Sequence, residues 1–326
     1  MNLLLAAAAA SLCLAVVMWI ALVLARWLRH RSMVRRGKRR PAAGLALAEY
    51  CADGDVDRLG GKLAHLPVDD VIAVAGRALP SLSRIDRAAV GAALASRGMA
   101  RAIIRRFARS DENRRILYCE LLGTIGGEDA LSALRAALKD RATNVRIAAG
   151  IALVELGQAP PLAQLLTMLG RAARGSSRLV YLLEKLVPGC EAEIVRLVTT
   201  PAREPRLRIN ALQALGLASP LTHRALLLQL GQEPCPEVAV EVARAIGREI
   251  GAKAGAVLAA MLFHAAPSVR REAAAAIGTG GFTNAGPALV RLTSGPDPMV
   301  AAAAARSLWL LRKTPAHDYQ AAGEAA

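Results

Sequence analysis

The sequence is poor in aromatic residues and lacks a catalytic or metal-binding motif. Aromatics make up 3% of the 326 residues, whereas proteins that bind single-stranded nucleic acid usually stack bases on aromatic side chains. None of the five histidines is followed by glutamate, no Cys/His cluster has zinc-ligand spacing, and there is no G-x-S-x-G or G-x-G-x-x-G segment. We therefore predict that the protein is not an enzyme and has no catalytic residue, metal site or cofactor.

Cysteines are also few, and their spacing does not indicate disulfides. The five are Cys13, Cys51, Cys119, Cys190 and Cys235, an odd number without a C-x-x-C pair. This pattern is typical of reduced, mostly buried thiols in a cytosolic domain.

One acidic segment has only part of a calcium-loop pattern. Asp53, Asp55 and Asp57 alternate as calcium ligands do, but Arg58 stands where the loop needs glycine, and Ala64 where it needs glutamate. We interpret the segment as a turn between helices that contains a helix-capping acid.

What the sequence does contain is a period of 31 residues. Four sets of residues recur at this spacing: Pro205, Pro236, Pro267 and Pro298; Leu207, Val238, Val269 and Val300; Leu215, Ile246, Ile277 and Leu308; and Gly216, Gly247 and Gly278. A fixed period of this length indicates stacked units, each of which buries its apolar face against its neighbours.

Each unit is predicted to be a pair of antiparallel helices. Proline suits the first helical turn, where its missing N–H would have no partner. After Pro267, Val269, Ala273 and Ile277 fall on one helix face, and Gly278 either turns the backbone or lets a neighbour approach closely. A second apolar helix follows from 285 to 292. The register continues upstream to about residue 111, although the unit at Ser176 matches it poorly.

Three segments that open with Val-Arg-x-x-Ala or Leu-Arg-x-x-Ala resemble HEAT repeats, chiefly the short bacterial kind. They begin at Val145-Arg146, Leu207-Arg208 and Val269-Arg270. The resemblance covers residues 111–313 and implies an α-solenoid, in which Asp140 would pair with Arg146. We place divergent N-terminal capping helices at 45–110 and a flexible C-terminal tail at 314–326.

The first forty residues indicate a membrane anchor. Residues 3–25 carry no charge, and 23 residues suffice to cross a hydrocarbon core of about 30 Å. Eight basic residues and no acid follow in a juxtamembrane linker at 26–44: Arg26, Arg29, Arg31, Arg35, Arg36, Lys38, Arg39 and Arg40. We expect 1–25 to form an N-terminal transmembrane helix, because no basic region precedes the apolar run as it would in a cleaved signal peptide.

The basic linker sets the expected orientation and its partners. Basic residues that flank a span stay on the cytoplasmic side, and they attract anionic headgroups. This predicts a single-pass protein of a bacterial inner membrane, with its N-terminus outside and the repeats in the cytoplasm. Its partners would be the bilayer through 3–25, anionic lipid headgroups through 26–40, and a protein that we cannot name.

Some charged residues share positions in the repeat. Without the eight linker charges, the net charge falls from +16 to +8. Two readings stay open for the recurring residues, a structural role at helix starts or a surface that binds a partner. The candidate partner-binding residues are Arg115, Arg146, Arg208, Glu241, Arg270 and Glu272. Glu241 and Glu272 share one repeat position and are candidates to lie close together.

The fold class that we predict is all-α, a HEAT-like α-solenoid preceded by one transmembrane helix. The predicted function is a membrane-tethered scaffold or adaptor that binds a protein partner, for example as an accessory subunit of a membrane enzyme complex. The alternative is a solenoid that binds nucleic acid through a basic concave face, to which the scarcity of aromatics gives little support.

Overall fold

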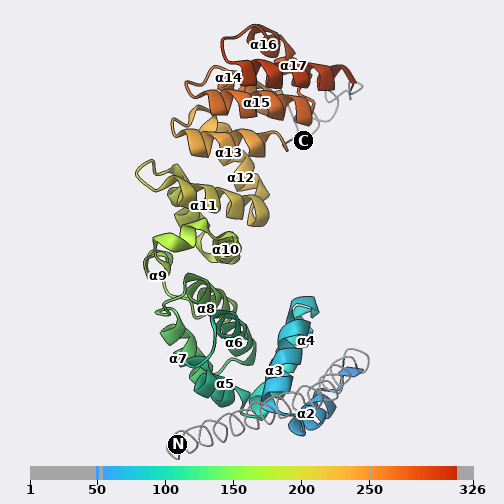
Figure 1. The fold of residues 1–326 in the computed structure, drawn as a ribbon, viewed down its shortest axis with the longest axis vertical. Coiled ribbons are helices and arrows are strands. Elements are labelled where there is room, and N and C mark those ends of the chain that lie inside the picture. The colour runs from blue at the N-terminus through green and yellow to red at the C-terminus, as the bar shows by residue number, and fades with distance from the viewer. Residues whose placement is uncertain (1–48, 51–53, 250–251, 314–326) are drawn as a thin grey trace, which may run out of the picture. The chain divides into compact units, whose positions relative to one another are not determined.

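The computed structural model describes residues 49–50, 54–249 and 252–313. Every regular element in this part of the chain is a helix. The chain divides into two compact units, unit 1 up to Gln158 and unit 2 from Ala159 (Figure 1). An all-α fold was predicted, and the described residues confirm it. The boundary predicted between capping helices and solenoid, at 110/111, is not tested and stays a prediction.

Unit 1 contains two alternating sets of helices. The first set is α2 (Val56–Ala64), α4 (Arg84–Ser96), α6 (Glu112–Ile125) and α8 (Thr143–Glu155), and the second is α3 (Val68–Ala78), α5 (Met99–Phe107) and α7 (Glu128–Ala137), with a short 3₁₀ helix η1 (Leu79–Ser81) after α3. In the first set α2 packs on α4, α4 on α6 and α6 on α8, while α5 packs on α7. The helices predicted upstream of residue 111 therefore continue the stack.

Unit 2 repeats this arrangement with proline-marked helices. These are α11 (Pro205–Ala218), α13 (Pro236–Ile246), α15 (Pro267–Gly280) and α17 (Pro298–Lys313), and between them lie α12 (Pro220–Gln229), α14 (Ala252–Met261) and α16 (Gly286–Leu292). The remaining elements are α9 (Leu162–Leu169), α10 (Ser177–Thr199), η2 (Arg171–Gly175), η3 (Leu230–Gln232) and η4 (Thr283–Ala285).

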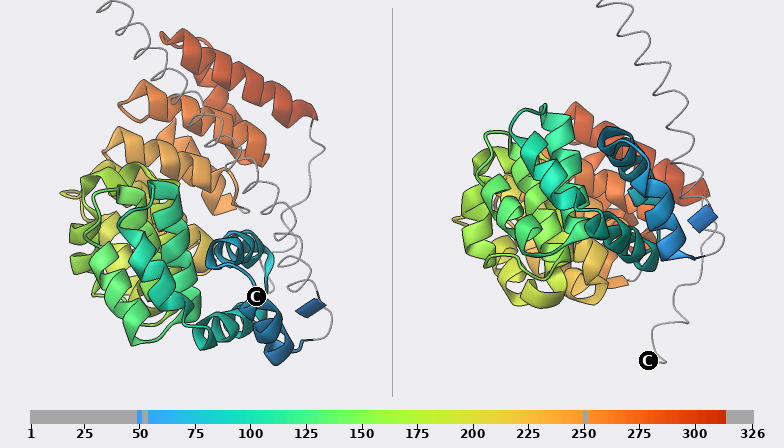
Figure 2. Two further views of the ribbon diagram at one scale, coloured as in Figure 1. Left: turned by 60° about the horizontal axis from the view of Figure 1, so that its bottom comes forward. Right: turned by 90° about the horizontal axis from the view of Figure 1, so that it is seen from below.

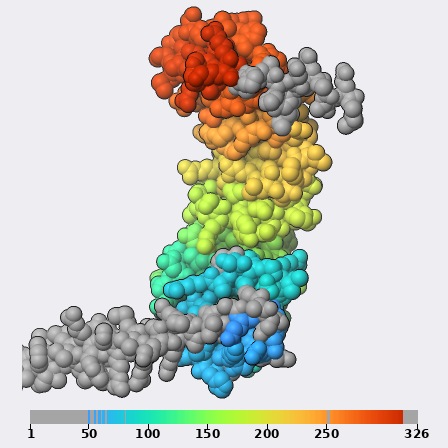
Figure 3. Space-filling view, turned by 90° about the vertical axis from the view of Figure 1, so that its right-hand side faces the viewer, coloured from blue at the N-terminus to red at the C-terminus, as the bar shows by residue number. Residues whose placement is uncertain are grey.

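The proline-marked helices stack in chain order. α10 packs on α11, α11 on α13, α13 on α15 and α15 on α17. Figure 2 shows α13, α15 and α17 side by side, and in Figure 3 the colours of unit 2 follow one another from yellow-green to red. Each helix therefore buries its apolar face mainly against its immediate neighbours, as expected of a repeat array.

Proline and the recurring apolar residue act as the sequence predicts. α11, α13, α15 and α17 begin at the four periodic prolines. The third residue of each helix is buried: Leu207, Val238, Val269 and Val300 are each at most 3% exposed.

The periodic glycines allow neighbouring helices to approach closely. A Cβ atom at Gly278 would lie 2.5 Å from Oγ of Ser307 on α17, and one at Gly247 would lie 2.8 Å from Cβ of Ala276 on α15. Both contacts are shorter than van der Waals distance. Of the two roles open to Gly278 from the sequence, the close approach is the one observed, since Gly278 lies inside α15.

The poorly matching unit at Ser176 has a shifted register. Its first buried apolar residue is Leu179 rather than Ser176, the position where the period counted from Val145 would place it. α10 then runs through what are two helices elsewhere, and it breaks at Cys190, where φ is −136° and ψ is 24°. Pro188 precedes this break, as expected of a residue that cannot donate the helical hydrogen bond.

The acidic turn caps helix α2. Asp55 is the N-cap of α2, and its side chain accepts a hydrogen bond of 2.9 Å from the main-chain N–H of Arg58. This confirms the reading of a capping acid. α2 forms although Gly60 and Gly61 lie in its interior, where glycine is unfavourable.

The predicted membrane localisation is corrected. In the part of the chain that the structure describes, no helix is long and apolar enough to cross a membrane. The longest described helix, α10, carries six charged residues: Arg178, Glu184, Lys185, Glu191, Glu193 and Arg196. We therefore do not retain the single-pass localisation. Its predicted span at 3–25, the basic residues of 26–40 and the C-terminal tail at 314–326 lie outside the described residues.

Candidate partner-binding face

Two of the recurring arginines lie in the interior and form ion pairs there. In unit 1, Arg115 is buried, and its guanidinium lies 2.9 Å from the carboxylate of Asp140. It also donates to the main-chain oxygen of Ser110 at 2.8 Å. The pair joins the start of α6 to the loop before α8.

The second buried pair, in unit 2, is Arg208 with Glu233. Arg208 is 1% exposed and donates to both carboxylate oxygens of Glu233, at 2.8 and 2.6 Å. Its Nε donates to the main-chain oxygen of Val198 at 2.7 Å. Burial raises the pKa of Glu233, but the hydrogen bonds from Arg208 and from the N–H of Cys235 outweigh this effect and hold the pKa below its usual range.

Asp140 and Glu233, the acids in these two pairs, occupy the same position of the repeat. Their side chains also cap the loop that follows them. Asp140, Glu233 and His264 stand whole periods apart. Each accepts a hydrogen bond from the main-chain N–H two residues later, at 2.8, 3.2 and 3.0 Å respectively. Three different residue types therefore perform the same capping role, because each presents an acceptor within reach of that N–H.

The other two recurring arginines, Arg146 and Arg270, bind loop carbonyls. Arg146 donates to the main-chain oxygen of Asp140 at 2.8 Å, and Arg270 donates to those of His264 and Ala265, at 2.9 and 2.8 Å. The expected pairing of Asp140 with Arg146 thus takes another form, since the carboxylate of Asp140 pairs with Arg115. All four arginines have a structural role at helix starts, the first of the two readings left open.

The two recurring glutamates do lie close together, joined by an arginine. Glu241 and Glu272 both accept from Arg244, at 2.9 and 3.1 Å. Gln213 on α11 donates to Glu241 at 3.0 Å. We call Gln213, Glu241, Arg244 and Glu272 the polar ladder, which crosses α11, α13 and α15. Partial burial lowers the pKa of Arg244, but the carboxylates of Glu272 and Glu241 outweigh this effect and raise the pKa above its usual range. The guanidinium therefore stays protonated.

A cavity of about 520 Å³ opens beside the polar ladder in unit 2. Besides three ladder residues, its walls include Leu217, His223 and Arg248. Leu217 is 64% exposed, and Leu221 nearby in sequence is 83% exposed. Burial lowers the pKa of His223 despite the neighbouring Glu249, so the ring is neutral at neutral pH. We call the polar ladder, this cavity and the two leucines the candidate partner-binding face.

The face offers binding chemistry of two kinds. The ladder carries two carboxylates and a guanidinium fork, which can exchange hydrogen bonds with the polar groups of an extended peptide. The leucines offer apolar surface that a partner can remove from water at about 25 cal/mol per Å². In the described residues no three His, Cys, Asp or Glu side chains are grouped so as to hold a metal ion.

Residues 100–180 match the family model for HEAT repeats. The match supports a HEAT-repeat protein. No curated protein matches the chain. Among solved structures, human deoxyhypusine hydroxylase in complex with glycerol is similar, with 19% identity and a TM-score of 0.34 over 87% of this chain and 99% of that chain. A computationally designed armadillo repeat protein for modular peptide recognition has 18% identity and a TM-score of 0.31 over 64% of this chain and 98% of that chain.

The HEAT-repeat match includes the pair of Arg115 with Asp140, whereas the polar ladder lies beyond it in the sequence. Sequence reasoning found Glu241 and Glu272 but missed Gln213 and Arg244. A signal was present, because Gln213 and Arg244 also stand one period apart. It was overlooked because the two residues differ in type.

Proposed function

We propose that this protein is a non-catalytic adaptor, and that the candidate partner-binding face in unit 2 holds a segment of another protein. The molecule is a helical repeat scaffold suited to protein–protein interaction. A repeat array presents an extended surface made of successive, similar helices. The partner would lie across α11, α13 and α15.

The observation that carries the proposal is the polar ladder beside exposed leucines. Four polar side chains on three successive helices are held in place by hydrogen bonds of 2.9 to 3.1 Å. Because they are already ordered, binding costs little further side-chain entropy. Leu217, which lines the cavity, adds exposed apolar surface at this face, and Leu221 is exposed four residues later; interfaces combine such apolar anchors with a polar rim.

The nucleic-acid alternative loses its main support. It depended on Arg115, Arg146, Arg208 and Arg270 as a basic surface. Arg115 and Arg208 are buried in ion pairs, and Arg146 and Arg270 donate to loop carbonyls. The buried guanidiniums of Arg115 and Arg208 cannot reach a phosphate backbone, and those of Arg146 and Arg270 are engaged by the loops.

Site-specific photo-crosslinking tests the proposal. A photo-reactive residue at Leu217 of the full chain should crosslink in cells to a defined partner, identified by mass spectrometry. Leu217→Asp should then reduce recovery of that partner by about tenfold or more, since a buried carboxylate costs several kcal/mol at an apolar contact. Val290 on α16 is 57% exposed and provides the matched control. The proposed face would be refuted if Val290→Asp reduced recovery of the partner as much as Leu217→Asp does. It would also be refuted if no crosslink formed from position 217.

A further inference from the structure

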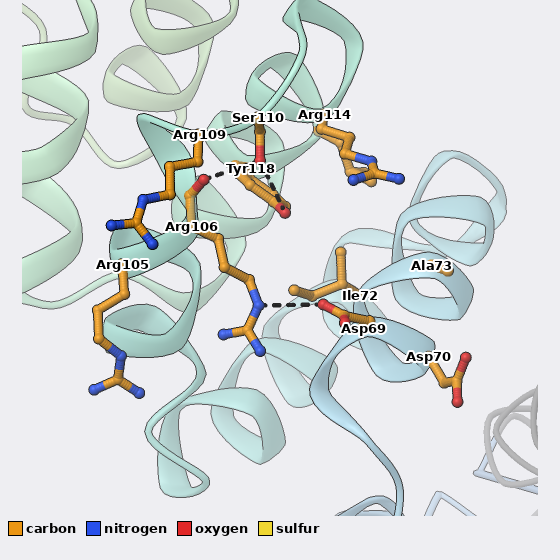
Figure 4. A pocket seen from close by; sticks show the side chains of 11 residues that line it. Asp69, Asp70, Ile72, Ala73, Arg105, Arg106, Arg109, Ser110, Arg114 and Tyr118 are labelled. Atoms are coloured by element: carbon orange, nitrogen blue, oxygen red, sulfur yellow. Dashed lines mark hydrogen bonds and ion pairs between the residues drawn. The ribbon is translucent and has the colours of Figure 1, made fainter. Parts of the chain in front are cut away.

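A second, strongly basic cavity lies in unit 1, apart from the candidate partner-binding face. It has a volume of about 440 Å³ and is walled by α3, α5 and α6 (Figure 4). Four arginines line it: Arg105, Arg106, Arg109 and Arg114. None of them belongs to the recurring arginines, so the repeat architecture does not account for this concentration of charge.

Two of the four guanidiniums are neutralised by carboxylates. Arg106 lies 3.2 Å from Asp69 on α3 and also donates to the main-chain oxygen of Ala102. Arg114 lies 3.5 Å from Asp111, in a pair that is exposed on both sides. Figure 4 shows Arg106 pointing toward Asp69.

The other two, Arg105 and Arg109, form no ion pair with any residue that the structure describes. Both are exposed; Arg105 lies in the last turn of α5, and Arg109 lies in the turn that follows the helix. Figure 4 shows their side chains on the same wall of the cavity as Arg106. The cavity therefore has two positive charges without a counter-charge.

The rest of the lining limits the kind of ligand. Asp69 on α3 faces Arg106 across the cavity, and Asp70 also lines the cavity but its carboxylate points away from the arginines in Figure 4, while Ile72 and Leu117 give an apolar part of the wall. The carboxylates would repel a continuous polyphosphate chain. A single anionic group on a carbon side chain fits the combination of a basic wall and an apolar wall.

We propose that this cavity binds a phosphate monoester carried by a segment of another protein. A phosphorylated side chain carries a charge of about −1.5 to −2, which matches the two guanidiniums without a counter-charge, whereas a carboxylate would neutralise only one. Arginine clusters are a recurrent means of recognising phosphorylated peptides, since the planar fork donates two parallel hydrogen bonds to phosphate oxygens. The site lies in unit 1 and does not depend on the face proposed in unit 2.

Fluorescence anisotropy with the full chain tests this assignment. The probe is a short labelled peptide with one phosphoserine, flanked by glycine and alanine, and its unphosphorylated form is the reference. At physiological salt the phosphopeptide should bind at least about tenfold more tightly, a difference of about 1.4 kcal/mol. Equal binding of the two peptides, or no binding of either, would overturn the proposal.

Two variants test whether phosphopeptide binding depends on the arginines of this cavity or on the positive charge of the protein in general. The double variant Arg105→Gln/Arg109→Gln should weaken phosphopeptide binding by at least about tenfold, because charge-assisted hydrogen bonds are lost. Arg101→Gln is the matched control, since Arg101 lies on the same helix, is 78% exposed, and pairs with Asp129 outside the cavity. Both variants change exposed residues and should keep the wild-type melting temperature. Equal losses in the two variants would contradict the assignment.

Competition identifies the source of the phosphate. Inorganic phosphate should displace the peptide only at concentrations well above the peptide's Kd, because it lacks contacts to the apolar wall. If inorganic phosphate displaces the peptide at concentrations equal to that Kd, the ligand is a free anion and the proposal of a phosphorylated peptide is overturned. A single-stranded oligonucleotide provides the nucleic-acid comparison. If it binds more tightly than the phosphopeptide and loses this affinity in the double variant, the ligand is nucleic acid and the proposal is overturned.

Discussion

Replacing Arg208 by methionine should destabilise unit 2 far more than replacing Arg270, although both occupy the same repeat position. Arg208 is almost fully buried, and its loss leaves the carboxylate of Glu233, itself 5% exposed, without a counter-charge. Breaking a buried ion pair in this way costs about 3–5 kcal/mol. Arg270 only donates two hydrogen bonds to loop carbonyls, each worth about 1 kcal/mol.

A double-mutant cycle isolates the ion pair from the other contacts of Arg208. The double variant Arg208→Met/Glu233→Met removes both charges, so it should recover most of the loss; buried pairs replaced by apolar residues are often neutral or stabilising. Recovery should be incomplete, since Val198 loses a donor and the N–H of Cys235 loses its acceptor, and each unsatisfied group costs about 1–3 kcal/mol.

Urea unfolding followed by circular dichroism measures these differences. The midpoint should fall in the order wild type, Arg270→Met, Arg208→Met, with the double variant above Arg208→Met. If Arg208→Met costs no more than Arg270→Met, or if the effects of the two single replacements simply add, the buried pair does not have the role assigned here.

Three further outcomes follow from other parts of the molecule. Gly278→Ala should lower stability by about 1–3 kcal/mol through overpacking, because the added Cβ would meet backbone and side-chain atoms of Ser307, whereas Gly286→Ala, with nothing within 4 Å, should not; thermal melts of the two variants compare them. Burial raises the pKa of the Cys119 thiol to about 12, so iodoacetamide should modify Cys119 only after the protein is unfolded, and modification in the native state would contradict its placement. The lowered pKa of Glu233 contributes stability at pH values above that of a free carboxyl, about 4.3, and this stability is lost as pH falls through the folded-state pKa. The acid-induced drop in urea midpoint should therefore be smaller in Arg208→Met, and an equal drop would refute this cause.

The sequence predicts those features that repeat by residue type. The four prolines begin helices and the third residues are buried, because these positions meet the same physical demand in every unit. The upstream helices α3, α4 and α5 lie within 45–110, where capping helices were predicted without the repeat spacing, and their apolar residues recur at helical intervals.

Features that depend on different residue types at one position were not predictable in the same way. Asp140, Glu233 and His264 cap equivalent loops, but no shared residue type marks the position. The partner of Arg208 lies less than one full period away in the sequence, so a search at the repeat spacing does not find it. The basic cavity of unit 1 was missed because its arginines come from two helices and a turn that pack together only in the folded chain.

The central claim is that successive helix pairs stack as similar units that contact mainly their immediate neighbours, and deletion of one period tests it most directly. Residues 236–266 make up one full period. Their removal joins Cys235 to Pro267 and places α15 against α11 in the position of α13. Because contacts in an array are mainly between neighbours, the shortened protein should unfold cooperatively in a thermal melt followed by circular dichroism, with its helical signal per residue retained. A shortened protein without helical signal or without a cooperative transition would contradict the account.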